Sequence, residues 1–235
     1  MKIIGQTCDW MQAPPADTLQ IIERAGRTCY KSEDKITPDS AAAFVKRIMA
    51  SHHESVIEHV SASMLFTTDR GVTHEMVRHR IASYSQESTR YCNYCKGKFD
   101  GEITVILPTF FYAEHEDAKP KGMFQMVCAG PEPTTRQRVY SEWAMACYDA
   151  EKRYKAMIDL GATAQEARSV LPNSLKTEIV MTANMREWRH FFALRCSQAA
   201  HPQMRDLATQ ALRRFAHLVS VIFDDLAIQY LQPKS

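Results

Sequence analysis

Residues 78–90 read Arg78-His79-Arg80-Ile81-Ala82-Ser83-Tyr84-Ser85-Gln86-Glu87-Ser88-Thr89-Arg90. The segment holds three guanidinium groups, one imidazole and five hydroxyl groups, so little of it suits a hydrophobic core. Arginine binds phosphate and carboxylate through a planar fork, and hydroxyl groups can donate to the remaining acceptors. The mixture predicts a site for an anionic ligand with several oxygen atoms. In an extended chain Ser88 and Arg90 would face the same way and could share one phosphate.

The surroundings of this segment are basic, although the chain as a whole is nearly neutral. Lys+Arg 29 against Asp+Glu 27 leaves a formal charge of +2, so no global field draws the protein onto nucleic acid or membrane. Two alternatives remain for the segment. One is a solvated basic loop. The other is a nucleic-acid-binding module over 70–98 in which Tyr84, Tyr91 and Tyr94 stack on bases, which the single small patch makes the weaker interpretation.

The fold class predicted from length and periodicity is α+β. A chain of 235 residues is long enough for one sizeable domain, and we expect a single domain over 1–235 with a mixed or antiparallel sheet flanked by several helices. Long helices are expected near 134–160 and 203–230, the second as one continuous helix. Shorter elements are expected as helices from Asp17 to near Gly26, from Thr37-Pro38, over 72–77 and over 185–195, and as strands over 60–68 and 103–107. Residues 175–182 fit strand or helix, and 110–133 is expected to be an irregular excursion.

Cysteine usage and hydropathy point to a cytoplasmic protein. Seven scattered cysteines are typical of reduced thiols, and no apolar run reaches the length of a membrane span. Cys92 and Cys95 form a lone CxxC without a second pair, which is weak support for zinc. Residues 51–59 contain three histidines and two glutamates, but their spacing differs from the HExxH of a zinc helix. The sequence therefore predicts no metal site.

Four separated blocks together resemble the flavin-dependent thymidylate synthase family. The first is Arg-His-Arg, seven residues, Ser, one residue and Arg, which begins at Arg78 and ends at Arg90. A second resembling block holds His53, Ser55, Glu58 and His59, with Val56 where proline is common in the family. The third runs over 166–172 and includes Arg168. The fourth contains Asn184, Arg186, His190 and Arg195.

The resemblance implies FAD as cofactor, dUMP and methylenetetrahydrofolate as substrates, and NADPH as the usual reductant. It also implies a homotetramer with shared active sites, and neither nucleic acid nor membrane as a partner. The residues that it assigns to dUMP are Glu75, Arg78, Gln86, Glu87, Ser88, Thr89, Arg90, Arg168 and Arg195. The residues that it assigns to FAD are His53, Ser55, Arg78, His79, Arg80, Gln86, Asn184, Arg186 and His190. At position 75 the family frequently has glutamine, so Glu75 keeps an acceptor but lacks the amide donor. We expect 72–77 to form a helix with Glu75 and Arg78 on one side.

Arg195 is the predicted catalytic residue. A guanidinium within about 4–6 Å of the uracil ring favours its ionised form and can lower its pKa by about one to three units. That shift makes C5 of the pyrimidine more nucleophilic. Ser88 as a nucleophile is the weaker hypothesis, because no paired base is evident beyond His79, nine residues back. A flavoprotein of this family that only oxidises NADPH is the alternative function.

Overall fold

A computed structural model describes residues 1–111 and 134–232, so nearly all of the excursion expected over 110–133 lies outside the described residues. The chain divides into two compact units. Unit 1 comprises Met1–Thr7, Thr67–Met76 and Gln86–Ile179, and unit 2 comprises Cys8–Phe66, Val77–Ser85 and Val180–Ser235. The expectation of a single domain over 1–235 stays a prediction.

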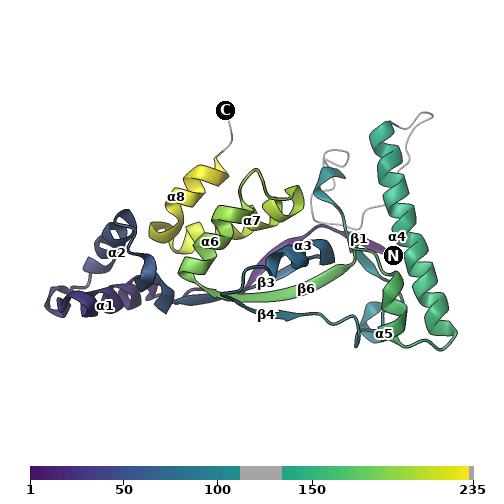
Figure 1. The fold of residues 1–235 in the computed structure, drawn as a ribbon, viewed down its shortest axis with the longest axis horizontal. Helices are drawn as coiled ribbons and strands as arrows, with labels where there is room; N and C mark the ends of the chain where they lie inside the picture. Colours follow the sequence, from purple (N-terminus) through teal and green to yellow (C-terminus); the bar gives the residue numbers. More distant parts are fainter. Residues whose placement is uncertain (112–133, 233–235) are drawn as a thin grey trace. The chain divides into compact units, whose positions relative to one another are not determined.

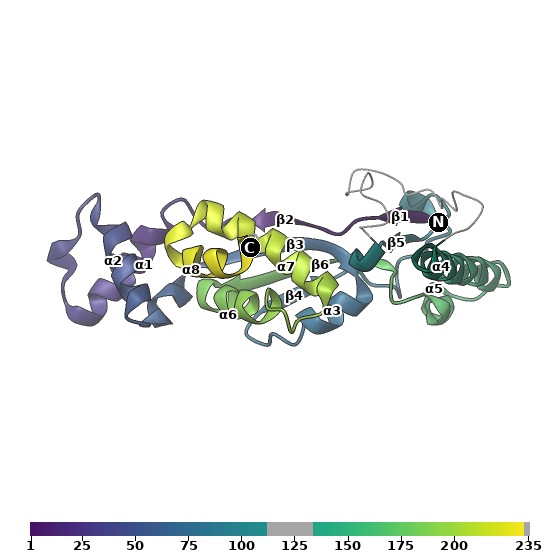
Figure 2. The ribbon, with the colours of Figure 1, turned by 90° about the horizontal axis from the view of Figure 1, so that it is seen from above.

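The largest sheet has four strands in the order β2-β3-β6-β4 (Figures 1 and 2). These strands are β2 (Thr7–Gln12), β3 (Ser61–Asp69), β6 (Lys176–Asn184) and β4 (Ser83–Gln86). β6 covers the region that fitted strand or helix, and its alternating burial is that of a strand with one buried face. The predicted α+β class, with an antiparallel sheet and several helices, is confirmed.

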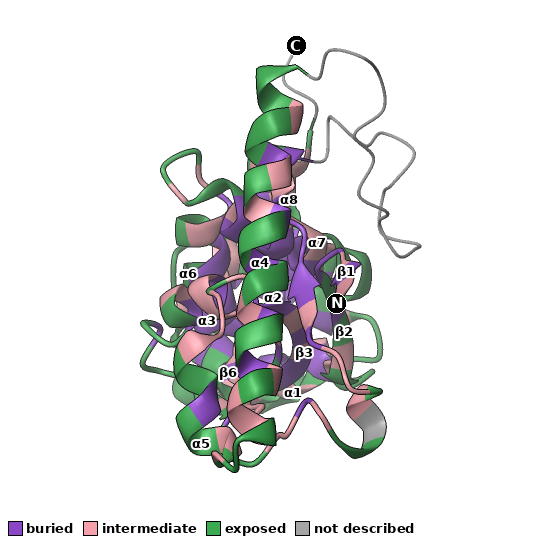
Figure 3. Ribbon diagram, turned by 90° about the vertical axis from the view of Figure 1, so that its right-hand side faces the viewer, coloured by how far each residue is buried: buried purple, intermediate pink, exposed green. Residues whose placement is uncertain are grey.

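Unit 1 has a two-stranded parallel sheet and one long helix. β1 (Lys2–Ile4) pairs with β5 (Thr104–Ile106), with Ile3 opposite Val105. The helix α4 (Thr135–Asp159) begins at the capping box of Thr134 and Gln137, as expected near 134. Most of its surface is exposed (Figure 3), and a narrow buried stripe packs into the core of the unit. The stripe repeats every three or four residues and consists of Tyr140, Ala144, Cys147, Glu151 and Tyr154. The unit also contains α3 (Arg70–Met76), α5 (Ala164–Ala167) and 3-10 helices at Gly97–Phe99 and Arg168–Val170.

Unit 2 is built from helices around an aromatic core. Its helices are α1 (Thr18–Tyr30), α2 (Ser40–Ala50), α6 (Met185–Arg195), α7 (Pro202–Leu218) and α8 (Ser220–Leu231), with 3-10 helices at Glu33–Lys35 and Glu54–His59. α6, α7 and α8 pack together (Figures 1 and 2). Their shared core is formed by fully buried rings, namely Trp188, Phe191, Phe192, Phe215 and Phe223.

Three predicted boundaries in unit 2 were wrong. α1 continues through Gly26 and ends at Tyr30, where Lys31 takes the left-handed conformation (φ 49°, ψ 49°). A Cβ on Gly26 would lie 2.5 Å from Cζ of Phe44, so glycine is needed here for the close packing of α1 on α2. α2 begins at Ser40, after Thr37-Pro38. The helix expected over 203–230 is two helices, because Val219 (φ −135°, ψ 56°) interrupts it. In the part of the chain that the structure describes, no helix has both the length and the apolarity to span a membrane.

Candidate active site

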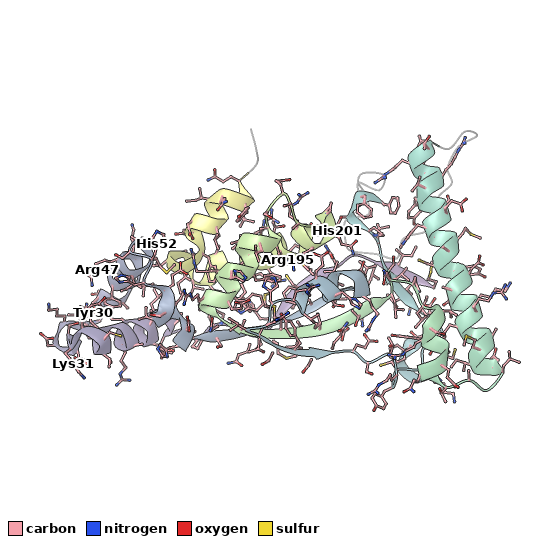
Figure 4. The ribbon with its side chains drawn as sticks, in the orientation of Figure 1. Tyr30, Lys31, Arg47, His52, Arg195 and His201 are labelled. Carbon is pink, nitrogen blue, oxygen red and sulfur yellow. The ribbon has the colours of Figure 1, made fainter. Side chains whose placement is uncertain are left out.

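Helix α6 carries most of the candidate site in unit 2. It starts directly after β6, and Asn184 caps it by accepting a hydrogen bond from the backbone N–H of Glu187 at 2.9 Å. Trp188, Phe191 and Phe192 bury one side of the helix. Because α6 has 3.6 residues per turn, Arg195 follows Phe191 along the edge of this buried face, whereas the exposed His190 lies on the other side of the helix. Figure 4 labels Arg195 at the end of α6.

His79 lies between two residues of α6. Its Nδ1 is 3.2 Å from Oε1 of Glu187, and its Nε2 accepts a hydrogen bond from Nε of Arg195 at 3.0 Å. The backbone carbonyl of His79 accepts a hydrogen bond from the hydroxyl of Tyr84 at 2.9 Å. His79 is 4% exposed and Glu187 is 7% exposed. We call His79, Glu187, Arg195 and Tyr84 the His79 cluster.

The electrostatics of the cluster keep the imidazole neutral. Burial, and then the charges of Arg195 and His190, lower the pKa of His79 to about 4. Burial raises the pKa of Glu187, and the charge of His190 opposes the shift only in part. Burial, with the nearby Glu187, raises the pKa of Tyr84 to about 12. His79 is therefore an uncharged hydrogen-bonding group at neutral pH.

The only group of metal-ligand type within the described ranges is His79, Glu187 and His190, whose ligand atoms lie within 4.8 Å of one another. Both ring nitrogens of His79 already take part in hydrogen bonds, Nδ1 with Glu187 and Nε2 with the guanidinium of Arg195. A second cation would have to displace Arg195 or lie against its charge. The arrangement favours the hydrogen-bonded cluster over a metal ion.

Two cavities in unit 2 bring together the residues predicted for FAD. A cavity of about 270 Å³ is lined by Asn184, Arg186 and His190, together with Glu58, Ile81 and Glu187. A cavity of about 400 Å³ is lined by His53, Ser55 and Arg186, together with Cys29, Tyr30, Ile48, His52, Glu54 and Val56. Arg186 belongs to both. It is exposed and pairs with Glu58 at 2.6 Å. An arginine, histidines and a hydroxyl group around two cavities that share Arg186 are suitable donors for a phosphorylated cofactor such as FAD.

A third cavity in unit 2, of about 370 Å³, lies at one end of the α1–α2 pair. Tyr30 and Arg47, both labelled in Figure 4, line it together with Arg27, Lys35 and Phe44. The guanidinium carbons of Arg27 and Arg47 lie 4.7 Å and 5.3 Å from the ring centre of Phe44. Glu23 holds Arg27 in a buried ion pair at 2.9 Å. This basic cavity was not predicted from the sequence.

In unit 1 the residues predicted for dUMP form two local groups. Nη1 of Arg168 donates to Oγ1 of Thr89 at 3.2 Å, so these two predicted residues are neighbours. Glu87 accepts from Lys176 at 3.1 Å and from the hydroxyl of Tyr94 at 3.4 Å. Gln86 donates to Thr73 and to Thr177 and is therefore a structural crosslink in this unit.

Two expectations about this segment were wrong. Ser88 and Arg90 are in a turn, in which the backbone N–H of Tyr91 donates to the carbonyl of Ser88 at 3.2 Å. Oγ of Ser88 accepts from the backbone N–H of Arg90, so the two side chains do not share an extended face. The helix that carries Glu75 is α3, which ends at Met76. Arg78 therefore lies outside this helix and does not share a side of it with Glu75.

The predicted guanidinium groups are divided between the units. Arg90 and Arg168 belong to unit 1, whereas Arg78, Arg80 and Arg195 belong to unit 2. Their convergence on one ligand stays a prediction. Sequence reasoning missed Glu187 and Tyr84 as members of the His79 cluster. The one available signal for Glu187 was its position on the same helix as Arg195, eight residues before it.

Comparison with known proteins decides the family. The family model described as "Thymidylate synthase complementing protein" matches residues 12–219, which contain all four sequence blocks. The chain is 36% identical over 208 residues to a flavin-dependent thymidylate synthase from Geobacter sulfurreducens, covering 86% of this chain and 78% of the relative. It is 37% identical over 216 residues to one from Mycobacterium avium, covering 90% and 80%.

The chain belongs to the flavin-dependent thymidylate synthase family. Among solved structures it is similar to a UMP/dUMP methylase, PolB from Streptomyces cacaoi, bound with 5-Br dUMP. The TM-score is 0.74 at 23% identity, and the match covers 98% of both chains. That likeness shows that this member of the flavin-dependent thymidylate synthase family shares the methylase fold over nearly its whole length.

Proposed function

We propose that this protein is an FAD-dependent thymidylate synthase, which methylates dUMP to dTMP with methylenetetrahydrofolate as the one-carbon donor and NADPH as the reductant. Membership of the family carries the proposal. The names of the relatives and of the methylase PolB supply the flavin, the product and the nucleotide. The proposed setting is the cytoplasm, and the proposed assembly is a homotetramer whose active sites combine residues of several subunits.

The donor chemistry of unit 2 fits FAD. We assign His53, Ser55, Arg186, Asn184 and His190 to it, because these residues line two cavities that share Arg186. Arg78, His79, Arg80 and Gln86 complete the proposed set. When bound, FAD supplies the hydride that no side chain can supply.

For dUMP we propose Arg78, Arg90 and Arg168 as phosphate-binding candidates, because the guanidinium fork matches phosphate oxygens. Arg168 already donates to Thr89, so the two side chains can act on one group. The rest of the proposed set is Glu75, Gln86, Glu87, Ser88, Thr89 and Arg195. Arg195 stabilises negative charge on the uracil ring and so activates C5.

The test is direct. The purified protein should bind FAD with the yellow absorption bands of a flavin, release tritium from dUMP labelled at C5, and form dTMP in proportion to NADPH oxidation. A colourless protein that binds no added FAD and releases no tritium contradicts the proposal. NADPH oxidation without dTMP would identify the alternative, a flavoprotein oxidase of the same family.

A further inference from the structure

We propose that Glu187 is a positioning residue, which acts through His79 to hold the guanidinium of Arg195 toward its substrate. This inference rests on the proposed function, because it requires Arg195 to act on the uracil ring. It adds to the predicted site a glutamate for which the sequence blocks gave no role. It also gives His79 a role that is separate from binding FAD.

The direction of the hydrogen bonds follows from the chemistry of the three groups. A guanidinium can only donate, so Nε2 of His79 must accept from Nε of Arg195 at 3.0 Å. A neutral imidazole has one N–H, and that proton must then be on Nδ1. Nδ1 lies 3.2 Å from Oε1 of Glu187, which therefore accepts it. Arg195 donates to His79, and His79 donates to Glu187.

Burial makes this order of donors and acceptors costly to change. His79 and Glu187 are nearly inaccessible, and the ring of Phe191 packs edge-on against the imidazole at 5.0 Å. Tyr84 also holds the backbone of His79. If Nδ1 lost its acceptor, either a buried donor would remain without a partner or the proton would move to Nε2. In the second case two donors, Nε2 of His79 and Nε of Arg195, would face each other.

The position of Glu187 on the fold suits this task. Glu187 lies in the first turn of α6, where its backbone N–H is held by Asn184, and Arg195 is the last residue of the same helix. The two positions are about 12 Å apart along the helix axis. One imidazole therefore links the two ends of a helix whose aromatic residues are buried in the core, with Phe191 between Glu187 and Arg195 on the same face. Glu187 also lines the cavity of about 270 Å³ that contains Asn184, Arg186 and His190.

The first experiment compares Glu187→Ala and Glu187→Gln with Glu142→Ala, an exposed acidic residue of α4 outside the site. At saturating dUMP we expect Glu187→Ala to lower kcat about 100-fold, because small displacements of a reacting group have effects of this size. Glu187→Gln keeps an acceptor oxygen and should lower kcat only about tenfold. Glu142→Ala should match the unaltered protein.

The second experiment separates positioning from general damage. In an Arg195→Ala background, adding Glu187→Ala should change the residual kcat by no more than about twofold, because Glu187 then has nothing left to orient. A full additional loss in the double variant would overturn the inference. So would loss of FAD and of thermal stability in both Glu187 variants, since that result shows a structural role alone.

The third experiment does not depend on activity. In protein with ¹⁵N-labelled histidine, the His79 signal, assigned by its loss in His79→Gln, should show a protonated Nδ1 and an unprotonated Nε2. Glu187→Ala should shift that tautomer. A proton on Nε2 in the unaltered protein would overturn the inference even if dTMP is formed, whereas an inactive protein with the expected tautomer would count against the proposed function alone.

Discussion

Each unit contains a glutamate held by a basic partner, and the two arrangements differ in how they depend on charge. In unit 2, Glu187 accepts from His79, which is neutral at pH 7. In unit 1, Lys176 lies between two carboxylates, at 3.1 Å from Glu87 and 2.7 Å from Glu178. In the His79 cluster, the position of one proton on the imidazole orients Glu187 and Arg195. In the Lys176 group, opposite charges attract the ammonium group to the two carboxylates.

The difference appears in the direction of the pKa shifts. Burial lowers the pKa of Lys176, but its hydrogen bond to Glu178 and the charge of Glu87 outweigh burial and raise it. Burial dominates at His79 and lowers its pKa to about 4. Directional hydrogen bonds of a buried neutral group suit precise orientation, whereas a partly exposed ion pair tolerates movement. We therefore expect the chemistry to depend more on the His79 cluster than on the Lys176 group.

The largest expected effect is at Arg195. Arg195→Ala should lower kcat for dTMP formation at saturating dUMP about 1000-fold, the equivalent of three pKa units in the ionisation of the ring. Arg195→Lys keeps the charge but loses the Nε donor to His79, and it should give an intermediate rate. Arg153→Ala, an exposed arginine of α4, is the control. Unchanged dTMP formation in Arg195→Ala would remove the reason to place the chemistry at this cluster.

The next largest effect is expected in the pH dependence of stability, through His79. A histidine with a lowered pKa contributes stability that is fully present above its ordinary pKa of 6.5 and is lost as the pH falls through about 4. Between pH 7 and pH 4 this loss should be about 3 kcal/mol in the free energy of unfolding. The raised pKa of Glu187 acts in the opposite sense and reduces the net change.

Denaturant unfolding at several pH values measures this contribution. His79→Gln should flatten the acid limb of the plot of unfolding free energy against pH, because it removes the imidazole and leaves the carboxylates of the protein in place. Parallel acid limbs in the two proteins would mean that His79 is not held neutral by its surroundings.

Much of this molecule could be predicted from its sequence because the signals are local. Thr134 begins α4 through a capping box, and Asn184 caps α6, as side chains of these types do at helix starts. The α+β class follows from alternating and helical periodicities. The family follows from four short blocks, since their residue types and spacing are enough without any contact information.

What could not be predicted depends on contacts between residues distant in sequence. Glycine is common just after the end of a helix, but Gly26 lies inside α1. There the ring of Phe44 from α2 leaves no room for a side chain. The break at Val219 has no glycine or proline to mark it. The link from Glu187 through His79 to Arg195 joins positions more than 100 residues apart, and its proton position depends on burial, which the sequence does not show.

A smaller effect is expected at Glu87. Glu87→Gln removes a partly buried partner of Lys176 and leaves Tyr94 and Lys176 with a weaker acceptor, at a cost of about 1.5 kcal/mol in the free energy of unfolding. Urea unfolding at pH 7 measures the loss. Because Glu87 also belongs to the proposed dUMP set, the KM for dUMP should be determined for the same variant. If the free energy of unfolding falls by much more than this, the Lys176 group depends on a single hydrogen-bond partner as strongly as the His79 cluster is expected to do.

The smallest expected effect is at Glu178, which is about half exposed and contacts Lys176 at 2.7 Å. Exposed ion pairs lose most of their Coulomb energy to water and to side-chain ordering, so Glu178→Gln should lower the free energy of unfolding by only about 0.5 kcal/mol. High salt should remove most of that difference, because it screens exposed charges. The raised pKa of Lys176 adds stability that is present below 10.5 and is lost as the pH rises through the raised value. Unfolding of Glu178→Gln at pH 7 and pH 11 should therefore show a difference from the unaltered protein that shrinks at the higher pH, and a difference that grows instead would show that the pair is not held by charge.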